Sequence, residues 1–536
     1  MMNCSINTPS GTSCREWLRN NQNKRKDDIM PEYLDTYLEL EDVEKHNTFI
    51  NRKPNMADLP DFESSKGKLP EPVWDGHADS IEAYYKAWEI AFSNLGKPTE
   101  ENGFVSPYID AAFNGDIFLW DSCFMLMFGK YGDSVFKFQG TLDDFYCKQE
   151  PDGFIGRQYH EGNGISKFHR LDPVSTGPEI LAWCEWQYYQ NYGDKKRLAD
   201  VYYPLLCYHR WMRNYHRWQD GSYWSSGWGC GMDNQPRTDL EAVPGVEDWQ
   251  VETFHHGFMS WIDANFQALL SCKELLKMAK ELDITDGVDE LQKEVEYLTK
   301  FINEKMWSED DKYYYDRRGN GELLKVKSIA SYWGLLADGI PEERKADFIV
   351  HLENEKEFKR PHRVPTLSAD HPDYSDDGSY WNGGVWAPTN YMVIKGLSES
   401  GEEKLAHEIA LNHYENMMMV YHKTGTFFEN YAPESANPGN PAKGDFVGWA
   451  GIIPITVLIE YVLGIQVHAE KNEIVWHVRN LERHGIRRIP VGRDAYADLI
   501  CEARGNEAEK PNVTVKSDKP IKVTVVYGEN KFVIGE

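Results

Sequence analysis

The 536-residue sequence lacks any long apolar stretch, and this absence limits where the protein can work. Residues 1–28 contain no apolar segment of the kind a secretory leader needs, and no stretch elsewhere approaches the roughly 18 uninterrupted apolar residues of a membrane span. We therefore expect a soluble protein and favour the cytoplasm. A periplasmic or secreted location stays open, because removal of a leader would leave the same sequence.

Cysteine is scarce and scattered. The nine cysteines form no CxxC pair and their number is odd, so we expect free thiols rather than a disulfide framework or a zinc site. The pair His255 and His256 has no partner at ligand spacing, and HExxH, GxSxG and phosphate-cradle motifs do not occur. We expect no metal and no cofactor.

Positive charge is also in deficit, with 58 Lys and Arg against 86 Asp and Glu and a formal net charge of -28. Broad contact with phosphate backbones or anionic lipid needs the opposite balance. Nucleic acid and membrane surfaces are therefore not expected partners, while the oligomeric state is left open.

Three regions differ in pattern. Residues 1–72 are polar and predict an N-terminal extension and linker, and residues 73–465 alternate amphipathic helices with long loops. Residues 466–536 alternate β-branched and polar residues and predict a small antiparallel, β-sandwich-like module. Helices are expected at 79–95 and at about 178–192, 195–216, 257–282, 288–306, 328–337, 402–421 and 448–463.

What the sequence has in abundance is aromatic residues, at 13% of the chain, and many lie in loops beside Gly, Asp or Asn. Tryptophans at helical spacing belong in a core, whereas a tryptophan in a glycine-rich loop can stack on the apolar face of a sugar. These loops cover residues 113–122, 151–160, 227–237, 377–391 and 427–451, and the last is long enough to suggest a functional role.

Paired carboxylates are the chemistry that such loops best support. Glycoside hydrolysis needs one protonated acid for the leaving oxygen and one ionised acid for water or the anomeric carbon. Asp233 and Glu429 are candidates, since partial burial among aromatic rings could raise the pKa of the acid that must keep its proton. Each could instead be a turn-capping residue. Asp121 is a third candidate, suited to accept hydrogen bonds from sugar hydroxyls.

Four ordered motifs carry a family resemblance: FLWDS (118–122), SGWGCGMDNQPR (226–237), YWNGGVWAPTNYMVIKGL (380–397) and FFENYAPESANPG followed by FVGWAG (427–451). They resemble those of the inverting (α/α)6-barrel glycoside hydrolases. That group includes family 63 α-glucosidases, mannosylglycerate and glucosylglycerate hydrolases and, more distantly, family 37 trehalases. The resemblance implies a mainly α fold, an (α/α)6 toroid of the six-hairpin glycosidase type.

The same resemblance implies that Asp233 is the general acid and Glu429 the general base of a single-displacement, inverting hydrolysis. The implied substrate-binding residues are Trp120, Asp121, Trp228, Asn234, Arg237, Trp381, Trp386, Asn390, Tyr431 and Trp449. Two departures from the family pattern, Gly229-Cys230-Gly231 before the acid and Asn382 with Gly384 in the YWNGGVW motif, concern the substrate more than the chemistry.

These inferences predict an exo-acting glycoside hydrolase, most directly an α-glucosidase that removes one terminal sugar. A mannosylglycerate- or glucosylglycerate-type hydrolase is the alternative; it would need cations such as Arg157 or Lys443 to hold a carboxylate. Two other classes stay open: a sugar epimerase or isomerase using His160 or His255 as base, and a non-catalytic carbohydrate-binding protein.

Overall fold

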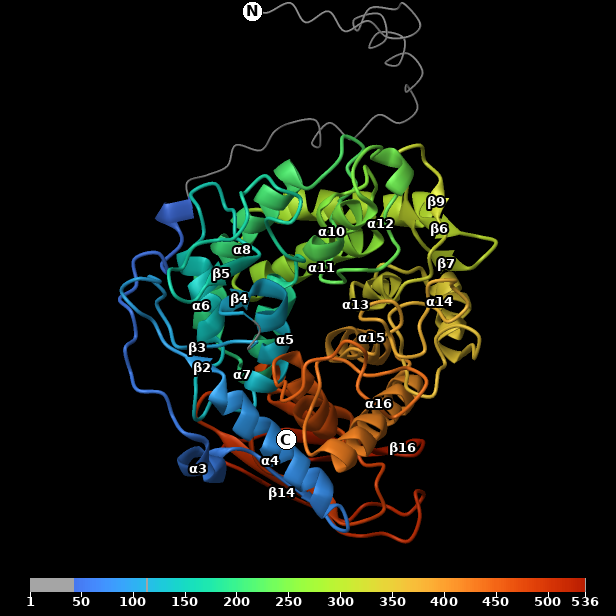
Figure 1. The fold of residues 1–536 in the computed structure, drawn as a ribbon. Helices are drawn as coiled ribbons and strands as arrows, with labels where there is room; N and C mark the ends of the chain where they lie inside the picture. The colour runs from blue at the N-terminus through green and yellow to red at the C-terminus, as the bar shows by residue number, and fades with distance from the viewer. Residues whose placement is uncertain (1–42, 112–113, 536) are drawn as a thin grey trace, which may run out of the picture.

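The computed structural model describes residues 43–111 and 114–535 (Figure 1). The first 42 residues of the predicted N-terminal extension therefore lie outside the described part of the chain. Within that part, no helix is both long enough and apolar enough to cross a membrane.

Helices dominate the described chain from residue 78 to residue 462. The main ones are α4 (Ala78–Ser93), α5 (Leu119–Gly129), α6 (Gly140–Cys147), α7 (Leu181–Tyr192), α8 (Lys195–Tyr215), α11 (Ile262–Glu281), α12 (Val288–Lys305), α13 (Trp333–Leu336), α14 (Glu342–Ile349), α15 (Ala387–Glu399), α16 (Glu403–Thr424), η6 (Trp449–Ile452) and η7 (Ile453–Val462). Their ends follow local rules: Asp194 caps α8 by accepting a hydrogen bond from the Arg197 amide, and α7 ends at Gly193 with φ of 64°.

The helices contact one another in a closed circuit. α5 packs on α7, α7 on α11, α11 on α13, α13 on α15, α15 on η6, and η6 returns to α5. Figure 1 shows α5, α11, α13 and α15 around the centre of the molecule, and every residue of α5 and η7 is buried. Burial all round a helix marks an inner position. α8, α12, α16 and α4 pack against these inner helices.

The C-terminal strands, together with β1 from the N-terminal part of the chain, form two four-stranded sheets. One has the order β1 (Glu71–Trp74), β12 (His484–Pro490), β13 (Tyr496–Cys501), β14 (Val513–Ser517), and the other β10 (Ile465–His468), β11 (Glu473–His477), β15 (Lys522–Tyr527), β16 (Asn530–Ile534). The predicted antiparallel pattern holds except that β11 pairs with β15 in parallel. β1 crosses the predicted boundary at residues 72 and 73 and pairs with β12, so these distant segments share a sheet.

Several helices begin inside stretches that were expected to be loops. α5 starts at Leu119 within the 113–122 stretch, α15 starts at Ala387 within 377–391, and the glycine-rich 227–237 stretch contains the short helix α9 (Gly227–Cys230). α5 was missed because it is apolar on all sides and has no amphipathic period. The consequence is that Trp120 and Asp121 lie in the first turn of an inner helix.

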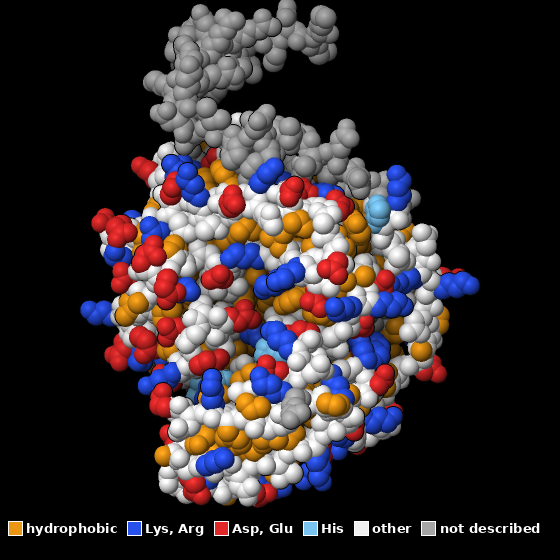
Figure 2. Space-filling view, turned by 180° about the vertical axis from the view of Figure 1, so that it is seen from behind, with side chains coloured by type: hydrophobic (Ala, Val, Ile, Leu, Met, Phe, Trp, Pro, Cys, Tyr) orange, Lys and Arg blue, Asp and Glu red, His pale blue; other side chains and the backbone are white. Residues whose placement is uncertain are grey.

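Charged side chains of both signs lie on the surface, as expected for a chain with 58 Lys and Arg and 86 Asp and Glu. Figure 2 shows Lys and Arg side chains interspersed with Asp and Glu side chains across that face of the molecule.

Candidate active site

A cavity of about 220 Å³ brings together residues from five of the regions that the sequence singled out. Its wall consists of Asn114, Phe118, Trp120, Asp121, Arg157, Gln158, Lys167, Gly177, Pro178, Trp228, Gly231, Asp233, Tyr380, Trp381 and Trp449. Six of these were predicted as site residues: Trp120, Asp121, Trp228, Asp233, Trp381 and Trp449. Aromatic walls with a few converging polar groups are typical of small-molecule sites.

The backbone around α9 turns Asp233 into this wall. Ser226 caps α9 by accepting a hydrogen bond from the Gly229 amide, and Gly231 ends it with φ of 80°. A Cβ on Gly231 would lie 3.2 Å from the Trp120 ring, so glycine allows both the left-handed turn and the close approach. Burial raises the pKa of Asp233 to about 6, although nearby Arg157 acts to lower it.

Glu429 is not one of the residues that line the cavity, but it contacts the wall residue Tyr380. Its Oε1 accepts a hydrogen bond from the Tyr380 hydroxyl at 2.9 Å, and its Oε2 accepts one from the Lys443 backbone amide at 3.1 Å. Burial raises the pKa of Glu429, these two hydrogen bonds oppose the rise, and the charge on Asp233 adds to it. Glu429 and Asp233 are therefore close enough to influence each other electrostatically.

Tyr380 connects Glu429 to the cavity through an unusual backbone conformation. Its φ is 68°, in the left-handed region that a bulky residue rarely adopts, and such residues concentrate at functional sites. A Cβ at Gly384 would lie 2.2 Å from the Tyr380 carbonyl oxygen, so the turn in this conformation leaves no room for a side chain there. This contact explains why the chain has glycine at that position of the YWNGGVW motif.

Two buried polar atoms in the wall have no hydrogen-bond partner within the protein. They are Nε1 of Trp120 and Oδ1 of Asp121. Burial raises the pKa of Asp121 to about 8, opposed by Arg157. Unpaired buried polar atoms are costly, so each of these two atoms lowers the stability of the wall.

Two cationic side chains, Arg157 and Lys167, line the cavity. The Arg157 guanidinium donates to the Trp228 carbonyl oxygen at 3.0 Å and lies 5.4 Å from the centres of the Phe118 and Trp228 rings. Lys167 is exposed, and its ammonium lies 5.9 Å from the Trp228 ring. Two cationic side chains therefore lie close to the Trp228 ring. Lys443, the other predicted cation, is not part of the wall.

Five predicted binding residues do not line the cavity: Asn234, Arg237, Trp386, Asn390 and Tyr431. Asn234 accepts a hydrogen bond from the Trp381 amide and donates to the Ser379 carbonyl oxygen, both at 2.9 Å. Arg237 is 1% exposed and pairs with Asp263 and Asp316. These two residues therefore hold the loops of the site to each other and to the helices.

Of the remaining three, Trp386 contacts a wall residue, whereas Asn390 and Tyr431 bind backbone atoms outside the wall. The Trp386 ring stacks on Trp381 at 3.8 Å, and Asn390 exchanges hydrogen bonds with the backbone of Val364. The Tyr431 hydroxyl accepts a hydrogen bond from the Phe428 amide. A direct substrate contact for these three stays a prediction.

Sequence reasoning did not select several wall residues, of which Tyr380, Gln158 and Lys167 are the most polar. Tyr380 could have been found, because it begins a motif that was already chosen. Gln158 donates to Asp116, and Lys167 lies far in sequence from every chosen motif. Gln158 lies within the 151–160 loop that the sequence singled out but was not selected, and Lys167 lies outside all five loops.

The histidines considered for an epimerase do not lie in the wall. The Nδ1 atoms of His160 and His255 accept hydrogen bonds from the Gly162 and Gly257 amides, at 3.0 and 2.9 Å. His160 lines an adjoining open pocket that shares Asn114 and Lys167 with the cavity.

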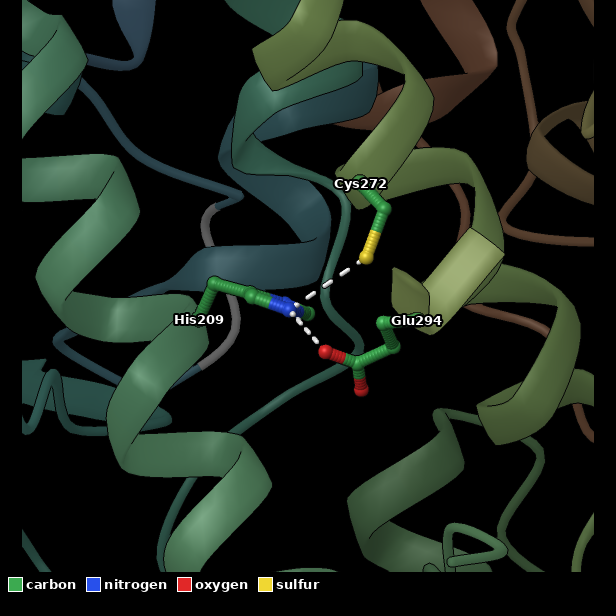
Figure 3. Close-up of side chains that lie close together, drawn as sticks. All are labelled: His209, Cys272 and Glu294. Carbon is green, nitrogen blue, oxygen red and sulfur yellow. Dashed lines mark hydrogen bonds and ion pairs between the residues drawn. The ribbon is translucent and has the colours of Figure 1, made fainter. Parts of the chain in front are cut away.

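One buried cluster elsewhere has the residue types of a metal site. His209 of α8, Cys272 of α11 and Glu294 of α12 offer ligand atoms within 4.8 Å of one another (Figure 3). However, the cation Arg213 lies 3.3 Å from Nε2 of His209 and pairs with Glu294. Nδ1 of His209 lies 2.6 Å from Glu179, next to the cavity residue Pro178. The donors are already engaged in an ion-pair network that joins three helices to the cavity wall.

The comparisons with known proteins agree with the predicted resemblance. An uncharacterized protein of Borreliella burgdorferi is 26% identical over 391 residues, covering 71% of this chain and 78% of that protein. A mannosylglycerate hydrolase of Thermus thermophilus is 24% identical over 348 residues, covering 54% and 83%. The solved structure of a GH63 mannosylglycerate hydrolase from Thermus thermophilus in complex with glucose has the same fold, with a TM-score of 0.57, 19% identity and coverage of 70% and 99%.

Residues 116–449, more than half of the chain and a span that includes the cavity carboxylates, match the family model described as "Mannosylglycerate hydrolase MGH1-like glycoside hydrolase domain". The predicted family resemblance is thereby confirmed. The chain belongs to the MGH1-like glycoside hydrolase family.

Proposed function

We propose that this protein is an inverting, exo-acting glycoside hydrolase built on an (α/α)6 toroid. The closed circuit of inner helices supports the toroid. The observation that carries the chemistry is the joint placement of two acids. Asp233 lies in the cavity wall, and another wall residue, Tyr380, binds the carboxylate of Glu429.

In the proposed reaction Asp233 is the general acid and Glu429 the general base. Asp233, protonated, gives its proton to the glycosidic oxygen as the bond to the anomeric carbon breaks. Glu429 takes a proton from a water that attacks that carbon from the opposite face, so the configuration inverts. The raised pKa of about 6 lets Asp233 keep its proton in mildly acidic solution, which an ordinary aspartate would not.

A single terminal sugar fits the cavity best. Its volume of about 220 Å³ lies below the roughly 300–1,000 Å³ typical of drug-sized ligands. The wall offers the Asp121 carboxyl group to the hydroxyls of the sugar and the Trp120, Trp381 and Trp449 rings to its apolar face. We propose an α-linked glucoside as the first substrate class.

A second candidate is a sugar joined to a small acid. Arg157 and Lys167 flank Trp228 in the cavity wall and could bind a carboxylate on the leaving group. The similarity to the Thermus mannosylglycerate hydrolase supports the same candidate.

The test is the release of free monosaccharide from a panel of α-linked glucosides, mannosides and glycosylglycerates. Hydrolysis of a neutral glucoside alone supports the first candidate. Hydrolysis of a glycosylglycerate that is lost in Arg157→Gln and Lys167→Gln supports the second. Interconversion of free sugars without hydrolysis would contradict the proposal and favour an isomerase.

Replacing Tyr380 with phenylalanine is expected to shift the pH dependence of the reaction. The Tyr380 hydroxyl bond lowers the pKa of Glu429, so its loss raises that pKa. The base must be ionised to act. As the pH is lowered, kcat/KM of the variant should therefore begin to fall at a higher pH than kcat/KM of the wild type. Because Asp233 loses its proton around pH 6, the alkaline side should stay in place.

The measurement is the pH profile of kcat/KM for both proteins. Tyr374→Phe is a matched control, since the Tyr374 hydroxyl lies in the same loop but binds Glu434. An unchanged acidic limb in Tyr380→Phe would show that Glu429 does not titrate on that limb.

A further inference from the structure

A line of aromatic side chains leads from the cavity wall to the surface. The Trp228 ring lies 4.9 Å from the Phe254 ring, which lies 6.2 Å from the Trp249 ring. Phe254 and Trp249 both belong to α10 (Asp248–Phe254). Since Trp228 lines the cavity, these rings are continuous with the proposed active site.

Trp249 is exceptional among the tryptophans that the structure describes. Its side chain is 54% exposed, and the other described tryptophans are buried or half-buried. An exposed indole offers a large flat apolar face on which a sugar ring can stack. The ring is also oriented, because its Nε1 donates a hydrogen bond to Glu247 at 2.6 Å. An exposed ring in a fixed orientation is a preformed contact surface.

Helix α10 is attached to the loop that carries the candidate acid. A Cβ on Gly227 would lie 2.3 Å from the Glu252 carbonyl oxygen, so only glycine permits α9 and α10 to pack this closely. The position of Trp249 is therefore set relative to Asp233 by direct backbone packing.

We propose that Trp249 forms a distal subsite that binds a sugar unit on the leaving-group side of the cleaved bond. This inference rests on the proposed function, and it specifies the substrate as an oligosaccharide of at least three units rather than a disaccharide or a glycosylglycerate. The cavity takes the terminal sugar, and the next units extend past Trp228 toward α10. The apolar face of one of them covers the exposed indole.

The test compares linear α-linked gluco- and manno-oligosaccharides of two, three and four units in the wild-type protein and in Trp249→Ala. In the wild type, kcat/KM should rise with length. In the variant, the rise should disappear, with a loss of about tenfold for the longer substrates, as expected for a well-placed aromatic anchor, and little change for the disaccharide. Trp249→Phe, which keeps a ring, should restore part of the rise.

Phe258→Ala is the matched control. Phe258 is 49% exposed on a nearby turn, but its ring contacts His255, His256 and Trp218 rather than the aromatic line. It should behave as wild type at every length. Equal loss in Trp249→Ala for all lengths, or no loss for any, would overturn the subsite.

A binding measurement separates this proposal from the proposed function. The Asp233→Asn protein, with and without Trp249→Ala, is titrated with the same oligosaccharides in a calorimeter. Weaker binding of the longer oligosaccharides after loss of Trp249 would support the subsite even if no substrate in the panel were cleaved. Equal affinity with and without Trp249, or no binding at all, would overturn it.

Discussion

Replacing Asp233 with asparagine is expected to lower kcat by about 10²–10⁴-fold for a substrate with a sugar leaving group, the range of general acid catalysis. Asparagine keeps the shape of the side chain but cannot donate the proton that the departing oxygen needs. Asp233 lies in the cavity wall with a pKa raised by burial, as the acid of such a reaction requires. Substrate binding should change little, because the variant loses proton transfer rather than a contact surface.

The leaving group provides an internal test of this role. A glycosyl fluoride, whose leaving ion needs little protonation, should be cleaved by Asp233→Asn at a rate much closer to wild type. The measurement is the ratio of kcat for the two substrate types in both proteins. Asp239→Asn is the control, since Asp239 is in the same loop but outside the cavity wall. Near-normal turnover of ordinary substrates by Asp233→Asn would remove Asp233 from the mechanism.

Replacing Glu429 with glutamine is expected to lower kcat by a similar factor, about 10²–10⁴. The dependence of this loss on the leaving group should differ from that of Asp233→Asn. Glutamine can still accept the Tyr380 hydrogen bond, yet it cannot take a proton from water. The loss should therefore be the same for sugar and fluoride leaving groups. This contrast with Asp233→Asn separates the base from the acid.

A smaller side chain adds a second readout. In Glu429→Ala the space left by the carboxyl group can admit azide, which needs no deprotonation to attack the anomeric carbon. Added azide should raise the rate and give a β-glycosyl azide from an α-linked substrate. Glu434→Gln is the control, because Glu434 lies in the same loop and pairs with Arg360 instead. Full activity of Glu429→Gln would contradict the assignment.

The loops that contain the candidate acids could be predicted from the sequence, because their residue types and spacing are distinctive. The glycine at 231 is needed for a left-handed turn against Trp120, and the acid follows two residues later. The glycines beside the acid are visible in the sequence, whereas the contact with Trp120 is visible only in the structure. The motifs also predicted that distant segments meet, and the cavity does bring Trp120, Asp233, Trp381 and Trp449 into one wall.

The contacts between elements were harder to predict. Arg237 could be selected for its place beside the acid, but its two buried partners, Asp263 and Asp316, come from distant segments with no motif. Lys167 and Trp249 belong to loops whose positions depend on tertiary packing. The apolar helix α5 and the parallel pairing of β11 with β15 likewise depend on neighbours that no local pattern reveals.

The most direct test of the central claim is the configuration of the first sugar released. A proton NMR time course follows the purified protein with an α-linked substrate and records the anomeric signals before mutarotation equilibrates them. We expect the β anomer to appear first, since in the proposed reaction Glu429 directs water to the face opposite the bond that Asp233 helps to break. Appearance of the α anomer first would contradict single displacement and require a covalent intermediate.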